Sequence, residues 1–332
     1  MENLDEVKRH LDERLARRRA RETEREPTPE VPRPRKKRPA SAGSGRGEGR
    51  TDRKKRRFSP LELFLLLSLA LALIVGVVAV GRGIGLVRSV AQRSYSALAD
   101  SPGGTAALAL IEEERLTDEE KLEKIRTDRD TYPDALRALA EDNGETLNYV
   151  YYYPELHSAR LAVDLTQELS GGVPALYQYD LRWGYASYGP GALALTGDGP
   201  TCLSMAALAL TGDEAYTPDA VAAYAEQNGY FNLTVGTTWS LMTQGSAAFG
   251  LSARELERSA QAMRDALREG AVLICYLTAE EPEAWDRYVV VTGYGDEGFV
   301  VHDPASAAQT AEGWGTAALV DRLIGVCALS VA

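Results

Sequence analysis

Residues 196–202 read Thr-Gly-Asp-Gly-Pro-Thr-Cys, and the mainly apolar run Leu-Ser-Met-Ala-Ala-Leu-Ala-Leu follows them directly. Because proline is favoured in the first turn of a helix, this pattern predicts a helix over about 200–210. Asp198 then lies at the helix N-terminus, where the aligned peptide dipoles favour a negative charge. Either a carboxylate or a thiolate would be stabilised there.

A second polar motif lies nearer the C-terminus. Residues 286–294 read Asp-Arg-Tyr-Val-Val-Val-Thr-Gly-Tyr, and residues 299–304 read Phe-Val-Val-His-Asp-Pro. The β-branched runs predict strands over 288–292 and 298–301, and Gly293 and Gly295 are placed to turn the chain between them. The motif therefore predicts a hairpin with polar residues at its ends.

The segments around these motifs predict an α+β domain over 173–332. After a strand-like run at 173–179, further helices are expected near 218–228, 238–249 and 259–269, and a further strand at 271–277. Helices that precede strands are typical of the α+β class. Residues 83–172 are predicted to form a helical stalk. One helix is expected to begin at 116–120 and a second at 132–134, where a proline lies in its first turn, and Asn143-Gly144 is expected to end the second helix.

The N-terminal part of the chain has a different chemistry. Residues 63–81 are nineteen positions without a charge, close to the roughly 20 needed to cross a bilayer, which predicts a transmembrane helix at 58–82. A cleaved signal peptide is the rival interpretation, but nearly sixty residues precede the apolar run. Residues 1–57 are rich in Arg, Glu, Pro, Gly and Ser and are expected to be a disordered tail.

Charge predicts the topology. The chain carries a net charge of −11, yet residues 1–57 hold 20 basic and 11 acidic side chains. Five consecutive basic residues at 53–57 abut the predicted span and place the tail in the cytoplasm, with the C-terminal region extracytoplasmic. The tail lacks interleaved aromatic residues, so a membrane surface is the expected partner and nucleic acid is not.

Three cysteines, Cys202, Cys275 and Cys327, are too few for a disulfide framework and are expected to be buried free thiols. No His, Cys and Asp cluster shows the spacing of metal ligands, so neither a metal nor a cofactor is expected.

The region from Tyr132 to Ala332 resembles the papain-like cysteine peptidases related to the bacteriocin double-glycine leader peptidases. The resemblance is carried by five short motifs in a specific order: residues 174–184 (Pro-Ala-Leu-Tyr-Gln-Tyr-Asp-Leu-Arg-Trp-Gly), 197–205, 236–239 (Gly-Thr-Thr-Trp), 288–294 and 303–304 (Asp-Pro). It implies a papain-like fold, with a helical part and an antiparallel sheet, following the membrane span.

The resemblance also implies roles for four residues, and two of them depart from the family pattern. Asp198 stands at the position of the nucleophilic cysteine, and Arg287 stands at the position of the basic histidine. Gln178 matches the oxyanion-stabilising glutamine, and Asp303 matches the residue that orients the histidine. Because an arginine cannot release its proton near neutral pH, the site is expected to lack thiol-peptidase activity. We expect Asp198 and Arg287 to form a salt bridge that preserves the charge pattern of thiolate and imidazolium.

Three functions remain open. The first is a non-catalytic, membrane-anchored peptidase-like module that binds peptide or a cell-envelope component in the inherited cleft. The second is an active hydrolase of exported peptides that uses Cys202, one helical turn beyond Asp198, as its nucleophile. The third is an envelope scaffold with an empty cleft. His302 adjoins Asp303 on a strand, so its side chain is expected to point away from the site.

Overall fold

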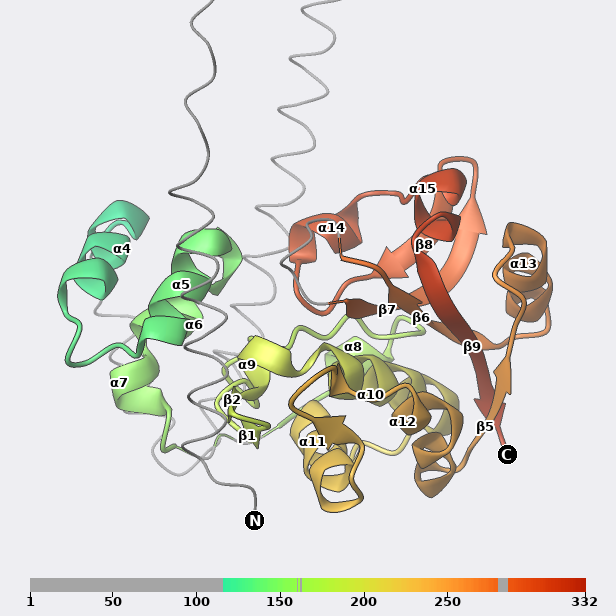
Figure 1. Cartoon of the computed structure of the whole chain (residues 1–332), viewed down its shortest axis with the longest axis horizontal. Coiled ribbons are helices and arrows are strands. Elements are labelled where there is room, and N and C mark those ends of the chain that lie inside the picture. Colours follow the sequence, from blue (N-terminus) through green and yellow to red (C-terminus); the bar gives the residue numbers. More distant parts are fainter. Residues whose placement is uncertain (1–115, 160, 162, 280–285) are drawn as a thin grey trace, which may run out of the picture. The chain divides into compact units, whose positions relative to one another are not determined.

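The computed structural model describes residues 116–159, 161, 163–279 and 286–332 (Figure 1). The predicted tail at 1–57 and the predicted span at 58–82 lie outside these residues. The elements in the first part of the described chain are short: α4 (Asp118–Thr127), α5 (Asp134–Asp142), η1 (Gly144–Thr146), α6 (Leu147–Tyr151), α7 (Tyr153–Leu156), α8 (Thr166–Leu169), β1 (Ser187–Tyr188), β2 (Gly191–Ala192) and α9 (Leu193–Thr196).

Local capping explains where the first helices begin and end. Thr117 caps α4 in a reciprocal capping box, in which its hydroxyl accepts from the Glu120 N–H and the Glu120 carboxylate accepts from the Thr117 N–H. Pro133 precedes α5, and Asn143 follows its last residue. The two predicted helix starts and the predicted end at Asn143 are therefore confirmed.

The second part of the described chain holds the longest helix and the main sheet. In chain order its elements are α10 (Asp198–Thr211), α11 (Pro218–Gln227), β3 (Phe231–Asn232), β4 (Gly236–Thr237), α12 (Ser240–Thr243), η2 (Gly245–Phe249), β5 (Leu251–Glu255), α13 (Ala260–Arg268), β6 (Val272–Leu277), β7 (Arg287–Gly295), β8 (Gly298–His302), α14 (Ala307–Ala311), α15 (Thr316–Val320) and β9 (Leu323–Val331). The predicted helix at 200–210 and hairpin at 288–301 are confirmed as α10 and β7–β8.

Five strands form an antiparallel sheet in the order β5-β9-β6-β7-β8. Alternate residues of β6 face opposite sides: Ile274 joins the core shared with α10, whereas Leu273 and Cys275 join the core shared with α13 and α15. Figure 1 shows the sheet with α10 on one side and α13 near its other side. The start of β7 is thereby held beside the start of α10.

The central helix α10 is almost entirely buried, which explains why its sequence is apolar on every face. Its first turn packs tightly on β4: a Cβ added at Gly199 would lie 2.5 Å from Cγ2 of Thr237, so this position requires glycine. At the other end, Gly212 adopts the left-handed conformation (φ 70°) and terminates the helix.

A further core cluster joins the N-terminal helices to the region after residue 173. Ile125, Leu136 and Val150 are buried in one cluster with Tyr177 and Tyr179. A hydrophobic core is thus shared by residues on both sides of the predicted boundary at 172/173 between a stalk and a domain.

Two expectations about individual elements were wrong, and two strands of the main sheet were missed. Residues 173–179, expected as a strand, belong to no helix or strand, and the expected helix at 238–249 is split into α12 and η2. The strands β5 and β9 were not predicted. β9 is a central strand whose partners, β5 and β6, lie about fifty or more residues earlier in the chain. Local pattern does not reveal such a pairing.

The expected fold class needs correction. Helices and antiparallel sheets are present, as the α+β assignment predicts. However, the expected class also included a transmembrane helix, and none of the helices within the described residues is long and apolar enough to cross a membrane. The longest of them, α10, has 14 residues, whereas a span needs about 20.

The three cysteines are buried free thiols, as predicted.

Candidate functional site

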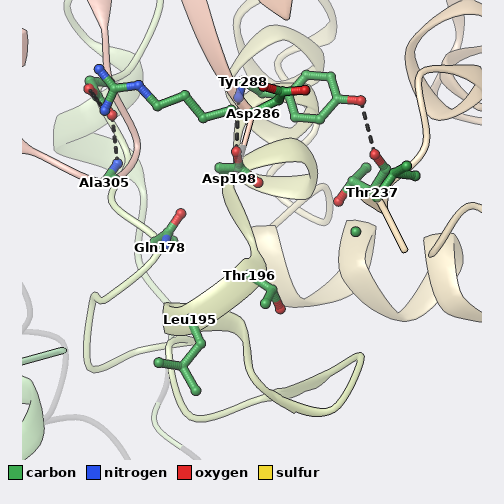
Figure 2. A pocket seen from close by; sticks show the side chains of 12 residues that line it. Gln178, Leu195, Thr196, Asp198, Thr237, Asp286, Tyr288 and Ala305 are labelled. Atoms are coloured by element: carbon green, nitrogen blue, oxygen red, sulfur yellow. Dashed lines mark hydrogen bonds and ion pairs between the residues drawn. The ribbon is translucent and has the colours of Figure 1, made fainter. Parts of the chain in front are cut away.

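A pocket of about 190 Å³ lies where the start of α10 meets the start of β7 (Figure 2). All four residues to which the resemblance assigns roles line it. The full lining is Gln178, Leu195, Thr196, Asp198, Val235, Gly236, Thr237, Asp286, Arg287, Tyr288, Asp303 and Ala305. The structure therefore brings together segments that are more than one hundred residues apart.

Asp198 is the first residue of α10 and is anchored by backbone donors. Its Oδ1 accepts from the Gly199 N–H at 2.8 Å. Its Oδ2 accepts from the Tyr288 N–H at 2.8 Å (Figure 2). Desolvation outweighs these two bonds and raises the pKa of the Asp198 carboxyl to about 6. The carboxylate thus connects helix to strand while remaining close to titration at neutral pH.

Arg287 is paired with Asp303 and not with Asp198. Its Nη1 lies 3.0 Å from Asp303 Oδ2, and its guanidinium carbon lies 5.5 Å from the centre of the Trp314 ring. Within the described residues no ion pair joins Arg287 to Asp198, so the predicted salt bridge is wrong. The reason is geometric: Trp314 and Asp303 hold the guanidinium away from Asp198.

Asp303 follows β8 and is 1% exposed. Its Oδ1 accepts from the Ala305 N–H at 2.9 Å. Burial raises the pKa of the Asp303 carboxyl, and the charge of Arg287 opposes this effect. Asp303 therefore orients an arginine here, where the resemblance implies that it would orient a histidine.

Gln178 presents an acceptor at the pocket. Its Nε2 donates to the Ala194 carbonyl at 2.8 Å, and its buried Oε1 has no hydrogen-bond partner. Because a carbonyl can only accept, the amide nitrogen must face Ala194, and the oxygen then faces the other way (Figure 2). An oxyanion site requires the opposite arrangement, with a donor aimed at the reacting oxygen.

Cys202 and His302 do not line the pocket. The Cys202 side chain is fully buried, and desolvation raises the pKa of its thiol well above the ordinary value. His302 Nδ1 lies 3.1 Å from the Pro174 carbonyl oxygen, and burial lowers the pKa of the imidazole. His302 therefore contacts a neighbouring loop, away from the pocket.

Several residues that build the site were not singled out from the sequence. Trp314 lies under the Arg287 guanidinium, and Asp286 lines the pocket beside it. Thr237 accepts a hydrogen bond at its carbonyl from the Tyr288 hydroxyl at 3.0 Å (Figure 2). A signal existed for Thr237, since it lies in the Gly-Thr-Thr-Trp motif, but no local pattern pointed to Trp314.

In the described part of the chain, no group of three or more His, Cys, Asp or Glu side chains is arranged to hold a metal ion. The arrangement offers carboxylate and amide acceptors beside one arginine that is already paired. Such a site can bind a hydrogen-bond donor.

Comparison with known proteins adds no assignment: no family model matches the chain, and neither a curated protein nor a solved structure matches it.

Proposed function

We propose that the chain is a non-catalytic relative of the papain-like cysteine peptidases and that it binds peptide in the pocket between α10 and β7. The observation that carries this proposal is the ion pair between Arg287 and Asp303, which occupies the position of the catalytic base. The sequence resemblance supports the relationship to the peptidases, and the geometry of this ion pair supports the absence of catalysis.

Thiol peptidases need a nucleophile and a neighbouring group that takes up and returns a proton. A guanidinium keeps its charge at neutral pH, and that of Arg287 is further held by a buried carboxylate. Asp198 has both of its oxygens engaged by backbone N–H groups, so it is poorly placed to attack a carbonyl. These features support binding without bond cleavage.

The alternative, a hydrolase that uses Cys202, has no supporting contact. Cys202 would have to reach the pocket, yet its side chain is fully buried and burial disfavours its thiolate.

The size of the pocket supports peptide over a folded partner as the ligand. About 190 Å³ accommodates one side chain or one chain end, and the exposed Val235 stands at its rim with 44% of its surface accessible. A folded protein would contact a far larger area, on the order of 800 Å² on each partner.

The test incubates the full chain with a random octapeptide library and measures retained and cleaved peptides by mass spectrometry. We expect intact peptides to be retained, and Val235→Trp to reduce retention about tenfold because the indole blocks the pocket. The matched control is Val300→Trp, since Val300 is 46% exposed but does not line the pocket. Cleavage that stops in Asp198→Asn or Cys202→Ser would refute the proposal.

A further inference from the structure

The charges around the pocket are unbalanced. Three carboxylates line it, those of Asp198, Asp286 and Asp303, together with one guanidinium, that of Arg287. Because Arg287 is paired with Asp303, Asp198 retains a negative charge that is opposed within 4 Å by no cationic side chain of the described residues. A partly desolvated anion in this position favours a positively charged ligand.

A second, independent feature points the same way. Gln178 is 7% exposed, and its Oε1 lacks a partner although unsatisfied buried acceptors are costly. The Ala194 carbonyl fixes the amide orientation, so this oxygen cannot be exchanged for the nitrogen by a flip. In Figure 2 the Gln178 oxygen points towards the side of the pocket where Asp198 lies. A donor placed between them would satisfy both groups.

We propose that the pocket recognises a primary ammonium group of a peptide, either its free N-terminus or a lysine side chain. An ammonium carries three donors on a compact charge, which suits single contacts to Asp198 and to Gln178 Oε1. A guanidinium fits less well, because its two-pronged pairing needs both oxygens of one carboxylate, and both Asp198 oxygens already accept from backbone N–H groups. This inference rests on the proposed function.

Among the groups that face Asp198, we expect only carboxyls to change charge as the pH falls. They come from five neighbouring segments: Tyr188 of β1, Cys202 of α10, Tyr276 of β6, Tyr288 and Arg287 of β7, and Asp303 after β8. Burial raises the pKa of the three tyrosines and of Cys202, so these groups stay neutral. Protonation of Asp198 as the pH falls through about 6, with Asp303 contributing in the same direction, would weaken the attraction for a cation.

The experiment compares four forms of one octapeptide library on the full wild-type chain. The forms carry both kinds of ammonium, lysine only after Nα-acetylation, the N-terminus only after replacement of lysine by norleucine, or neither. We expect the form with neither to be retained about tenfold less than the unmodified library, the size typical of one lost charge-assisted hydrogen bond. The two intermediate forms identify which ammonium is bound.

Amino-acid substitutions and changes of pH test whether Asp198 is the group that binds the ammonium. Asp198→Asn should reduce retention of the unmodified library to the level of the uncharged form, whereas Asp296→Asn, at an exposed turn, should not. If circular dichroism shows that Asp198→Asn does not fold, peptide retention by the wild-type chain is measured at decreasing pH instead. Retention of the unmodified library should fall about threefold or more from pH 7.5 to 5, whereas retention of the uncharged form should not change.

The outcomes separate the two proposals. Equal retention of all four forms, with sensitivity to Val235→Trp preserved, would overturn the ammonium inference and leave peptide binding standing. No retention of any form would overturn the proposed function. A flat pH profile for the unmodified library would also overturn the inference.

Discussion

Arg287 shows how the identity of one side chain limits the chemistry that a pocket can perform. The guanidinium stacks over Trp314 and pairs with Asp303, contacts that suit a planar, permanently charged group. Only about a quarter of the Arg287 side chain is exposed, and Asp303 is buried. Removing the arginine would leave an uncompensated buried carboxylate, so Arg287 contributes to folding as well as to the charge of the site.

Asp198 should make stability depend on pH. Its pKa rises from 3.8 to about 6 on folding, so between these values the folded carboxyl holds a proton that the unfolded chain has released. Its contribution to the unfolding free energy is therefore present below about pH 4 and is lost as the pH rises through about 6. Asparagine does not titrate, so the stability of wild type relative to Asp198→Asn should fall by roughly 2–3 kcal/mol over this range.

Urea denaturation of both proteins at several pH values between 4 and 8 measures this difference. Subtracting the two curves cancels the titration of carboxyls common to both proteins. A difference that stays constant, or that grows as the pH rises, would show that Asp198 is not held in a desolvated environment.

At the scale of elements, the segment that carries Asp303 is held in place by η1. The Glu145 carboxylate accepts from the Tyr179 hydroxyl at 2.6 Å, from the Ser306 hydroxyl at 2.8 Å, and from the N–H groups of Ala307 and Ala308 at the start of α14. A carboxylate at this position accepts hydrogen bonds from backbone N–H groups at the start of α14 that have no partner within the helix, and its charge interacts favourably with the helix dipole. The N-terminal helices therefore position one wall of the pocket.

Replacing Glu145 with Gln should lower the unfolding free energy by about 2 kcal/mol. The charge-assisted hydrogen bonds are lost, and the amide NH2 of the glutamine would face groups that are themselves hydrogen-bond donors. The matched control is Glu141→Gln, which removes an exposed ion pair with Arg126 and should cost less than about 1 kcal/mol. Urea denaturation of both variants at neutral pH provides the comparison. Equal losses would indicate that the Glu145 network contributes no more than a surface ion pair.

At the scale of the molecule, the N-terminal helices and the segment after residue 173 depend on one another through a shared core. Tyr149 illustrates the connection: its hydroxyl donates to the Gly184 carbonyl at 2.9 Å, and its ring stacks on that of Tyr185 at 4.4 Å between centroids. Tyr177 and Tyr179 are buried in the same cluster as Val150. Residues after 173 therefore rely on residues before 157 for part of their burial.

A chain that begins at Val173 should consequently fail to unfold cooperatively, whereas one that begins at Leu116 should unfold in a single transition. The reason is that each large apolar side chain that loses its burial costs about 1.5–3 kcal/mol, and a domain has only about 5–15 kcal/mol in total. Thermal denaturation followed by near-ultraviolet circular dichroism, with dye binding to exposed apolar surface, tests this. A sharp transition in the shorter chain would demonstrate that 173–332 is an independent domain.

Local sequence determined the features whose energetics are local. The capping box at Thr117, the proline in the first turn of α10 and the β-branched run of β7 each concern neighbouring residues, and each predicted its element. The alignment of motifs with a peptidase pattern also nominated Gln178 and Asp303, and both line the pocket.

Tertiary structure alone decided which groups pair. The resemblance to peptidases implies that Asp198 and Arg287 face each other. The choice of Asp303 as the partner of Arg287, however, depends on where Trp314 and the Tyr288 N–H lie. The pairing of β9 with β5 and β6, and the support of α14 by Glu145, likewise join distant segments. Contacts of this kind depend on packing across the whole chain, whereas capping and strand propensity act within a few residues.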